Sequence, residues 1–365
     1  MSTHIITGGL GFLGSHLAVR LAQRGENVVI LDLHGADDRL LRMISGIGLA
    51  DSAPMRSGST LKPPRATGTI TVMRGDATDP NAIITAQAAA AAAAGLPGLA
   101  EAPTCWAFAC HAAPDVYKLL PVETLEACAL GIREAVAFAK QTGGKVVLAS
   151  TSEVYGDPLV HPQTESYRGN VDPVGPRSCY DEGKRFAEAY LTAALPASQR
   201  AIVRIFNTIG PCSIRDTRMV PSFVRTALRE GVIHVHGNGQ QTRSPIYVTD
   251  LLDGIEAVVA HGDGNPYNVG GDEELSVGLV ASTVASVLRF TYGREVEIRF
   301  GDARCAHDPQ RRLPDLSRVR KLGWKGPRWL AASAVDQAAA WLVDSARHWP
   351  EVFPDPQNLG SLTGR

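Results

Sequence analysis

Short apolar runs alternate with helical patterns through about the first 210 residues of the chain. Runs typical of buried strands predict strands near 3–7, 27–32, 69–73, 104–109, 144–149 and 201–206. Between them, apolar residues recur at the spacing of one helix face. This alternation predicts a parallel sheet with helices on both faces. The expected fold class is therefore α/β, a doubly wound Rossmann-type parallel sheet.

Beyond residue 210 the pattern becomes irregular and predicts a smaller C-terminal domain. Residues 244–260 (SPIYVTDLLDGIEAVVA) predict a strand and a helix that rejoin the first domain. Further helices are predicted near 219–230, 276–290 and 329–347. We therefore predict a dinucleotide-binding domain of residues 1–210 rejoined by 241–262, and a substrate-binding domain of residues 211–240 and 263–350. Two other segments, 45–68 and the alanine-rich 86–103, are interpreted as surface insertions.

A glycine-rich turn follows the first predicted strand. In TGGLGFLGSHL, Gly8, Gly11 and Gly14 have the spacing G-x-x-G-x-x-G and lead into an amphipathic helix. The first two glycines let the backbone approach a pyrophosphate at the helix N-terminus, and the third lets the helix pack close to the strand. Asp32 ends the second strand at about the position of an acid that binds a ribose hydroxyl, which favours NAD over NADP. The predicted cofactor site also includes Phe12, Leu13 and Asp76.

A second pattern is typical of acid–base catalysis. Tyr180 and Lys184 lie one turn apart on the same face of a predicted helix, and Thr151 ends the apolar strand KVVLAST. A phenol has a pKa of about 10 and is a poor base at neutral pH. A nearby ammonium and the positive ring of oxidised nicotinamide would lower that pKa. Together with the glycine turn, these residues predict hydride transfer from a carbon whose hydroxyl gives its proton to Tyr180.

Composition excludes several other classes of function. The chain has 365 residues, 44% of them hydrophobic, and a formal net charge of −1, which gives no reason to expect a nucleic acid or an anionic membrane as a partner. It contains no apolar run of the roughly 18–20 residues that a membrane-spanning helix needs. Its six cysteines have no C-x-x-C pair and no zinc-type spacing with histidine, so we expect reduced thiols, no metal site and a cytoplasmic location.

Residues 149–188, ASTSEVYGDPLVHPQTESYRGNVDPVGPRSCYDEGKRFAE, resemble the extended short-chain dehydrogenase/reductase superfamily. Within it they resemble the UDP-glucuronate decarboxylase (UDP-xylose synthase) family, as do RIFNTIGP, GNGQQTRSPIYVTDLLDG and DPQRRLPDLSRVRKLGW. The resemblance implies a tightly held NAD that is reduced and reoxidised within one turnover. Oxidation at C4 of the glucuronate creates a β-keto acid, which loses carbon dioxide. Protonation at C5 and return of hydride to C4 then give UDP-xylose.

The resemblance also implies a role for each matching residue. Tyr180 is the base at the C4 hydroxyl, Lys184 lowers its pKa and binds the nicotinamide ribose, and Thr151 holds the C4 oxygen. Decarboxylation and reprotonation are assigned to Glu153 and Arg243, beside Ser152. The sugar site includes Tyr117, and the residues implied for the UDP portion are Asn207, Arg218 and Arg312. The family further implies a homodimer that pairs through helices near 115–140 and 178–195.

The same resemblance distinguishes decarboxylation from the reactions of related sugar-nucleotide enzymes. The 4,6-dehydratases have an acidic pair after the threonine, whereas here Ser152 precedes Glu153, and 4-epimerases usually have small or neutral residues in place of Glu153. Decarboxylation is therefore favoured over a UDP-glucuronate 4-epimerase or an enzyme that releases the 4-keto pentose. A non-catalytic nucleotide-sugar binding protein is a further alternative. Departures from the family pattern at Cys212 and Ser222 leave a related hexuronate or another nucleotide open as substrate.

Overall fold

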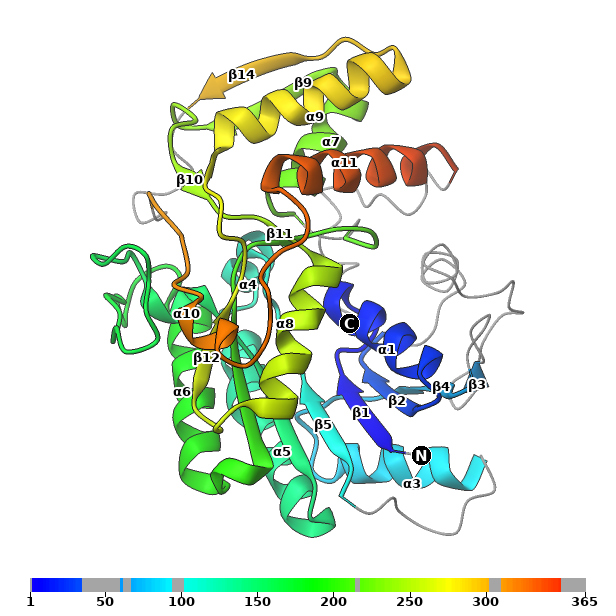
Figure 1. Ribbon diagram of the computed structural model, residues 1–365. Coiled ribbons are helices and arrows are strands. Elements are labelled where there is room, and N and C mark those ends of the chain that lie inside the picture. Colours follow the sequence, from blue (N-terminus) through cyan, green and yellow to red (C-terminus); the bar gives the residue numbers. More distant parts are fainter. Residues whose placement is uncertain are drawn as a thin grey trace.

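One large sheet organises the molecule (Figure 1). The computed structural model describes residues 2–34, 60–61, 67–93, 102–213, 217–301 and 310–348. Within these ranges eight strands form the sheet in the order β12-β7-β6-β5-β1-β2-β4-β3. All pairs are parallel except β3 with β4, at one edge. The strands are β1 Thr3–Thr7, β2 Asn27–Asp32, β3 Thr60–Leu61, β4 Thr69–Arg74, β5 Thr104–Ala107, β6 Lys145–Thr151, β7 Arg200–Ile205 and β12 Pro266–Val269.

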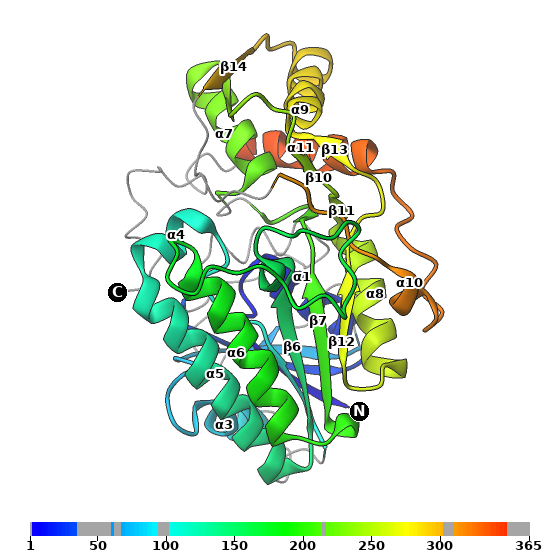
Figure 2. The same cartoon turned by 90° about the vertical axis from the view of Figure 1, so that its left-hand side faces the viewer.

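Helices cover both faces of this sheet (Figure 2). The helices on one face are α1 (Phe12–Gln23) and α8 (Val248–His261), and those on the other are α3 (Ala82–Ala93), α5 (Pro121–Thr142) and α6 (Ser178–Ala194). Because side chains alternate along a strand, β2 supplies both cores: Val28 and Ile30 pack toward α1 and α8, while Val29 and Leu31 pack toward the other helices. Burial of such side chains, at roughly 1.5–3 kcal/mol each, holds the layers together.

A smaller layer lies beyond the carboxyl ends of the strands, at the top of Figure 1. Its elements are α7 (Met219–Glu230), β9 (Val232–His236), α9 (Val277–Tyr292), β14 (Glu297–Gly301) and α11 (Ala331–His348). β9 and β14 pair in parallel, and the three helices pack on one another. The short connecting elements are α4 (Pro114–Leu119), 3₁₀ turns at Ser152–Tyr155 and Ala197–Gln199, β8 (Thr208–Ile209), β10 (Thr242–Arg243), β11 (Ile246–Tyr247), β13 (Leu275–Ser276) and α10 (Ser317–Arg320).

The architecture confirms the α/β fold class and a parallel sheet of seven strands, with β3 added antiparallel at its edge. The sheet also includes β12, which begins beyond the boundary at residue 262; the division into two domains stays a prediction. The interpretation of the alanine tract as a surface insertion is wrong for its first part. Ala86 and Ala90 of α3 are buried against the sheet, because small side chains let this helix approach it closely. Most of 45–68 lies outside the described residues.

Within the described part of the chain, every helix is too short or too polar to cross a bilayer.

Candidate active site

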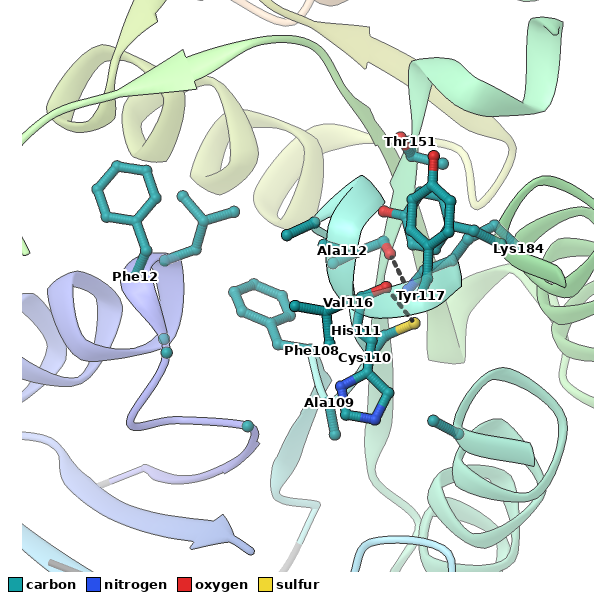
Figure 3. A pocket seen from close by; sticks show the side chains of 18 of the residues that line it. Phe12, Phe108, Ala109, Cys110, His111, Ala112, Val116, Tyr117, Thr151 and Lys184 are labelled. Carbon is teal, nitrogen blue, oxygen red and sulfur yellow. Dashed lines mark hydrogen bonds between the residues drawn. The ribbon is translucent and has the colours of Figure 1, made fainter. Parts of the chain in front are cut away.

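A cavity of about 420 Å³ lies at the carboxyl ends of the central strands. It opens where the strand order reverses, with β1 between β2 and β5, which is the usual ligand position in such sheets. Its volume falls within the roughly 300–1,000 Å³ of small-molecule sites. Figure 3 shows Phe12 at one end of this cavity, and Thr151 and Lys184 at the other.

The glycine turn is shaped for a ligand that approaches the backbone. Gly8 has φ +66°, and a Cβ there would lie 2.8 Å from Cα of Ala109. A Cβ on Gly14 would lie 2.7 Å from the carbonyl oxygen of Gly8. Gly11 is the N-cap of α1, and no side chain caps that helix or places an acid in its first turn. The first N–H groups of α1 can therefore bind a phosphate.

Two carboxylates at the ends of the neighbouring strands β2 and β4 also line the cavity. Asp32 ends β2 and is buried, and it accepts hydrogen bonds from the backbone N–H groups of Leu10 (3.0 Å) and His34 (3.1 Å). Asp76 follows β4 and accepts bonds from the N–H (2.9 Å) and hydroxyl (2.7 Å) of Thr78. These bonds fix both side chains. A fixed carboxylate at the end of β2 suits a ribose diol and repels a 2′-phosphate.

The acid–base residues meet at the far end of the cavity. Tyr180 is buried and stacks on Tyr117, with ring centroids 5.2 Å apart and planes at 2°. The ammonium of Lys184 lies 5.9 Å from the centre of the Tyr180 ring and donates a 2.9 Å hydrogen bond to the carbonyl of Ala149. Burial raises the pKa of the Tyr180 phenol well above its usual value, while a hydrogen bond with Thr151 acts in the opposite direction. A positive charge beside this ring would favour the phenolate.

Glu153 is held between two arginines. The guanidinium of Arg312 donates to both carboxylate oxygens, with Nη2 at 2.6 Å from Oε2, and Arg177 also donates to Oε2. Arg312 is 4% exposed and donates a further bond to the hydroxyl of Ser152 (2.9 Å). Burial alone would raise the pKa of Glu153, but the charges and hydrogen bonds of Arg312 and Arg177 outweigh it and lower that pKa to about 2. Glu153 is therefore ionised at neutral pH.

Comparison with known proteins identifies the family of this chain. Residues 4–270 match the model of the NAD dependent epimerase/dehydratase family. The chain belongs to that family. It is 36% identical over 328 residues to UDP-glucuronic acid decarboxylase 6 of Arabidopsis thaliana, which covers 88% of this chain and 83% of the relative. It is 34% identical over 325 residues to UDP-glucuronic acid decarboxylase 1 of Xenopus tropicalis, covering 88% and 68%.

Solved structures of other proteins share the fold. A dTDP-glucose 4,6-dehydratase of Bacillus anthracis in complex with NAD superposes with a TM-score of 0.71 at 17% identity, over 96% of this chain and 100% of that one. A UDP-glucose 4-epimerase of Bifidobacterium longum in complex with NAD+ and UDP gives 0.71 at 22% identity, with the same coverage. The glycine turn, the uncapped α1 N-terminus and Asp32 fit the family's cofactor. This epimerase/dehydratase-family chain is therefore an NAD-dependent enzyme.

Most of the predicted site residues line the cavity described above. They are Gly8, Gly11, Phe12, Leu13, Gly14, Asp32, Asp76, Tyr117, Thr151, Ser152, Glu153, Tyr180, Lys184, Asn207 and Arg218. Arg312 and Arg243 are not among the lining residues. Arg312 donates hydrogen bonds to two residues that do line the cavity, Glu153 and Ser152. Arg243 is buried on β10, where it donates to the carbonyl of Thr242 (2.8 Å). The individual roles assigned to all these residues stay predictions.

Two residues that sequence reasoning missed belong to the same cluster. Arg177, at the N-terminus of α6, contacts Glu153, and Asp181 lies on the next turn of that helix. Asp181 is 5% exposed, and its Oδ1 has no hydrogen-bond partner among the described residues. Burial and the charge of Glu153 raise the pKa of Asp181 to about 8 against the effect of the arginines. The motif GPRSCYDEGKR contains both residues, but its sequence alone gave neither of them a partner.

Proposed function

We propose that the enzyme decarboxylates UDP-glucuronate to UDP-xylose through a UDP-4-keto intermediate, with Tyr180 as the base at the C4 hydroxyl. The observation that carries the proposal is the position of Thr151, Tyr180 and Lys184 in the same cavity as the glycine turn. A sugar hydroxyl that reaches Tyr180 would therefore lie in the same cavity as a dinucleotide bound at the glycine turn. Identity of 34–36% to proteins named UDP-glucuronic acid decarboxylase supports the choice of substrate.

NAD, when bound, supplies the hydride acceptor and its positive ring. Tyr180 takes the proton of the C4 hydroxyl, because that positive charge and the hydrogen bond with Thr151 act against the effect of burial on its pKa. Thr151 then holds the C4 oxygen as the carbonyl forms. Lys184, fixed by the carbonyl of Ala149 and close to the tyrosine ring, would bind the nicotinamide ribose. The resulting β-keto acid loses carbon dioxide as its electrons pass toward the C4 oxygen.

The arginine pair determines what Glu153 can do next. An ionised carboxylate has no proton to give, so Glu153 in the observed arrangement can accept a proton or stabilise positive charge. For it to protonate C5 after decarboxylation, at least one of Arg177 and Arg312 must move away from it, since both lower its pKa. The carboxylate of the substrate is a suitable competitor for a guanidinium fork. We propose that Arg243 takes part in the same step.

The test is incubation of purified enzyme with UDP-glucuronate. The proposal predicts release of carbon dioxide and formation of UDP-xylose. A product that retains its carboxylate would instead identify a 4-epimerase, and a 4-keto pentose would show that hydride is not returned. Tyr180→Phe should abolish turnover and preserve NAD binding; full activity in this variant would remove Tyr180 from the mechanism.

We further propose that the enzyme is a homodimer that pairs through α4, α5 and α6. Large apolar side chains are exposed there: Leu119 (62%), Val122 (60%), Leu125 (42%) and Phe186 (47%). Leu125 lies beside Gly183 of α6, so this surface continues from one helix to the next. Light scattering of the purified protein should give twice the mass of the chain, and Val122→Glu should reduce it to a single chain. A monomeric parent protein would contradict the proposal.

A further inference from the structure

Three cysteines lie together beside the end of the cavity that contains Tyr180. Cys110 follows β5, Cys128 lies on α5 and Cys179 lies on α6. The sulfur atoms of Cys110 and Cys128 are 3.3 Å apart, while Cys179 donates to the carbonyl of Tyr117 (3.4 Å). Gly183 of α6 leaves the space that Cys128 fills, since a Cβ at Gly183 would lie 3.1 Å from its sulfur. No group of side chains in the described part of the chain is arranged to hold a metal ion.

Cys110 and Cys128 differ in their access to the cavity. Cys110 lines the cavity and is half-buried, and Cys128 is 3% exposed behind it. The hydrogen bond with Cys128 and the charge of Lys184 lower the pKa of Cys110 to about 7, against the effect of burial. The hydrogen bond with Cys110 and burial raise the pKa of Cys128. Because Cys110 lines the cavity while Cys128 is buried 3.3 Å from it, we expect Cys110 to be the thiol that an oxidant in the cavity meets first.

We propose that Cys110 and Cys128 form an oxidation site that a hydroperoxide converts reversibly into a disulfide. The thiolate of Cys110 attacks one peroxide oxygen; the O–O bond breaks, and an S–O bond forms with release of hydroxide. The sulfur of Cys128 then attacks the sulfur of Cys110, so that the S–O bond breaks, the S–S bond forms and the second oxygen leaves as water with the thiol proton. Overall, two thiols lose two electrons and two protons, and hydrogen peroxide becomes two waters.

Formation of the disulfide should change the shape of the cofactor site, because the segment that contains Cys110 contacts the glycine turn. An S–S bond of about 2.05 Å requires the two sulfurs to approach by more than 1 Å. The preceding residues of this segment, Phe108 and Ala109, donate to the hydroxyl of Thr7, and Ala109 packs against Gly8. A displacement of Cys110 should therefore also displace the glycine turn. We expect the oxidised enzyme to bind NAD more weakly.

The experiment treats purified enzyme with hydrogen peroxide, alkylates the remaining thiols after denaturation and maps the peptides by mass spectrometry. The expected product is a Cys110–Cys128 cross-linked peptide that dithiothreitol removes. Cys128→Ser should stop the reaction at a sulfenic acid on Cys110 that dimedone traps, and Cys110→Ser should prevent it. Cys105 and Cys212 are internal controls, because burial raises the pKa of each to about 12, and both should stay reduced.

Absence of the cross-link in folded, peroxide-treated enzyme would overturn the inference, as would equal oxidation of Cys105 and Cys212. A cross-link from Cys110 to Cys179 would also overturn it, because the partner would be wrong. Circular dichroism of each variant establishes that it is folded. The readout is a peptide mass, so its outcome is independent of which nucleotide sugar the enzyme uses.

Discussion

The ion pair between Glu153 and Arg312 should be one of the strongest pairwise interactions in the site. The pKa of Glu153 is lowered from 4.5 to about 2, which corresponds to about 3 kcal/mol of stabilisation of the carboxylate. Arg177 shares this effect, but Arg312 makes two of the three hydrogen bonds. We therefore expect a coupling energy of about 2 kcal/mol between Glu153 and Arg312. Arg312→Met alone should cost about 3 kcal/mol, because it leaves a largely buried carboxylate less compensated.

A double-mutant cycle measures this coupling directly. Unfolding by urea at pH 7 is compared for the parent, Glu153→Gln, Arg312→Met and the double variant. A matched cycle on the exposed pair Arg320–Asp272, whose side chains are 45% and 41% exposed, should give less than about 1 kcal/mol. A coupling for Glu153–Arg312 no larger than this control would refute the reasoning.

The dependence on pH has a definite sign. The pKa of Glu153 is lower in the folded state than in the unfolded chain, so its contribution is fully present above about pH 4.5. It should be lost as the pH falls from 4.5 through about 2. Glu153→Gln should remove this part of the loss of stability at low pH. If the free energy of unfolding depends on pH identically in both proteins, the lowered pKa of Glu153 is contradicted.

Three further predictions follow from single side chains. The pKa of Asp181 is raised to about 8 in the folded protein, whereas in the unfolded chain the carboxyl ionises at about pH 4. Between these values only the unfolded state ionises freely, so Asp181 lowers the free energy of unfolding more as the pH rises from about 4 toward 8. The stability gained by Asp181→Asn should thus grow between pH 5 and 7.5, by at most roughly 1.4 kcal/mol per pH unit in urea unfolding; a constant difference would contradict this. Gly8→Ala should weaken NAD binding at least about tenfold in calorimetry, because its Cβ would meet the Ala109 backbone. Gly131→Ala, where a Cβ meets nothing within 4 Å, should leave NAD binding unchanged, and equal affinities in both variants would refute the steric argument. Asp32→Asn should narrow the preference for NAD over NADP in binding titrations, since it removes the repulsion of a 2′-phosphate; an unchanged ratio would exclude that role.

The sequence predicted those parts of the fold and site that depend on local geometry. Apolar runs placed the six parallel strands that the first 210 residues contribute to the large sheet within a few residues of their observed bounds, but they did not predict the short strand β8. Tyr180 and Lys184 come together because residues four apart share a helix face, and the glycine turn follows directly from its strand. These patterns are complete within short stretches of chain.

Contacts between distant segments could not be predicted in the same way. Arg312 meets Glu153 only because the chain returns to the cavity from the C-terminal layer, and no spacing rule encodes that return. Asp181 stands next to Tyr180 in the sequence, yet its raised pKa depends on burial and on the charge of Glu153. The contact between Cys110 and Cys128 depends on how α5 packs against β5 and α6. The alanine tract was misjudged for a related reason, since its small side chains pack only once the sheet is present.

The most direct test of the proposed chemistry follows the hydrogen at C4 of the substrate. UDP-glucuronate that carries deuterium at C4 is incubated with the enzyme, and the product is analysed by mass spectrometry and NMR. If hydride leaves C4 for NAD and returns to the same carbon within one turnover, the product is UDP-xylose with deuterium retained at C4. A decarboxylated product with ordinary hydrogen at C4, or a labelled product that still has its carboxylate, would contradict the account.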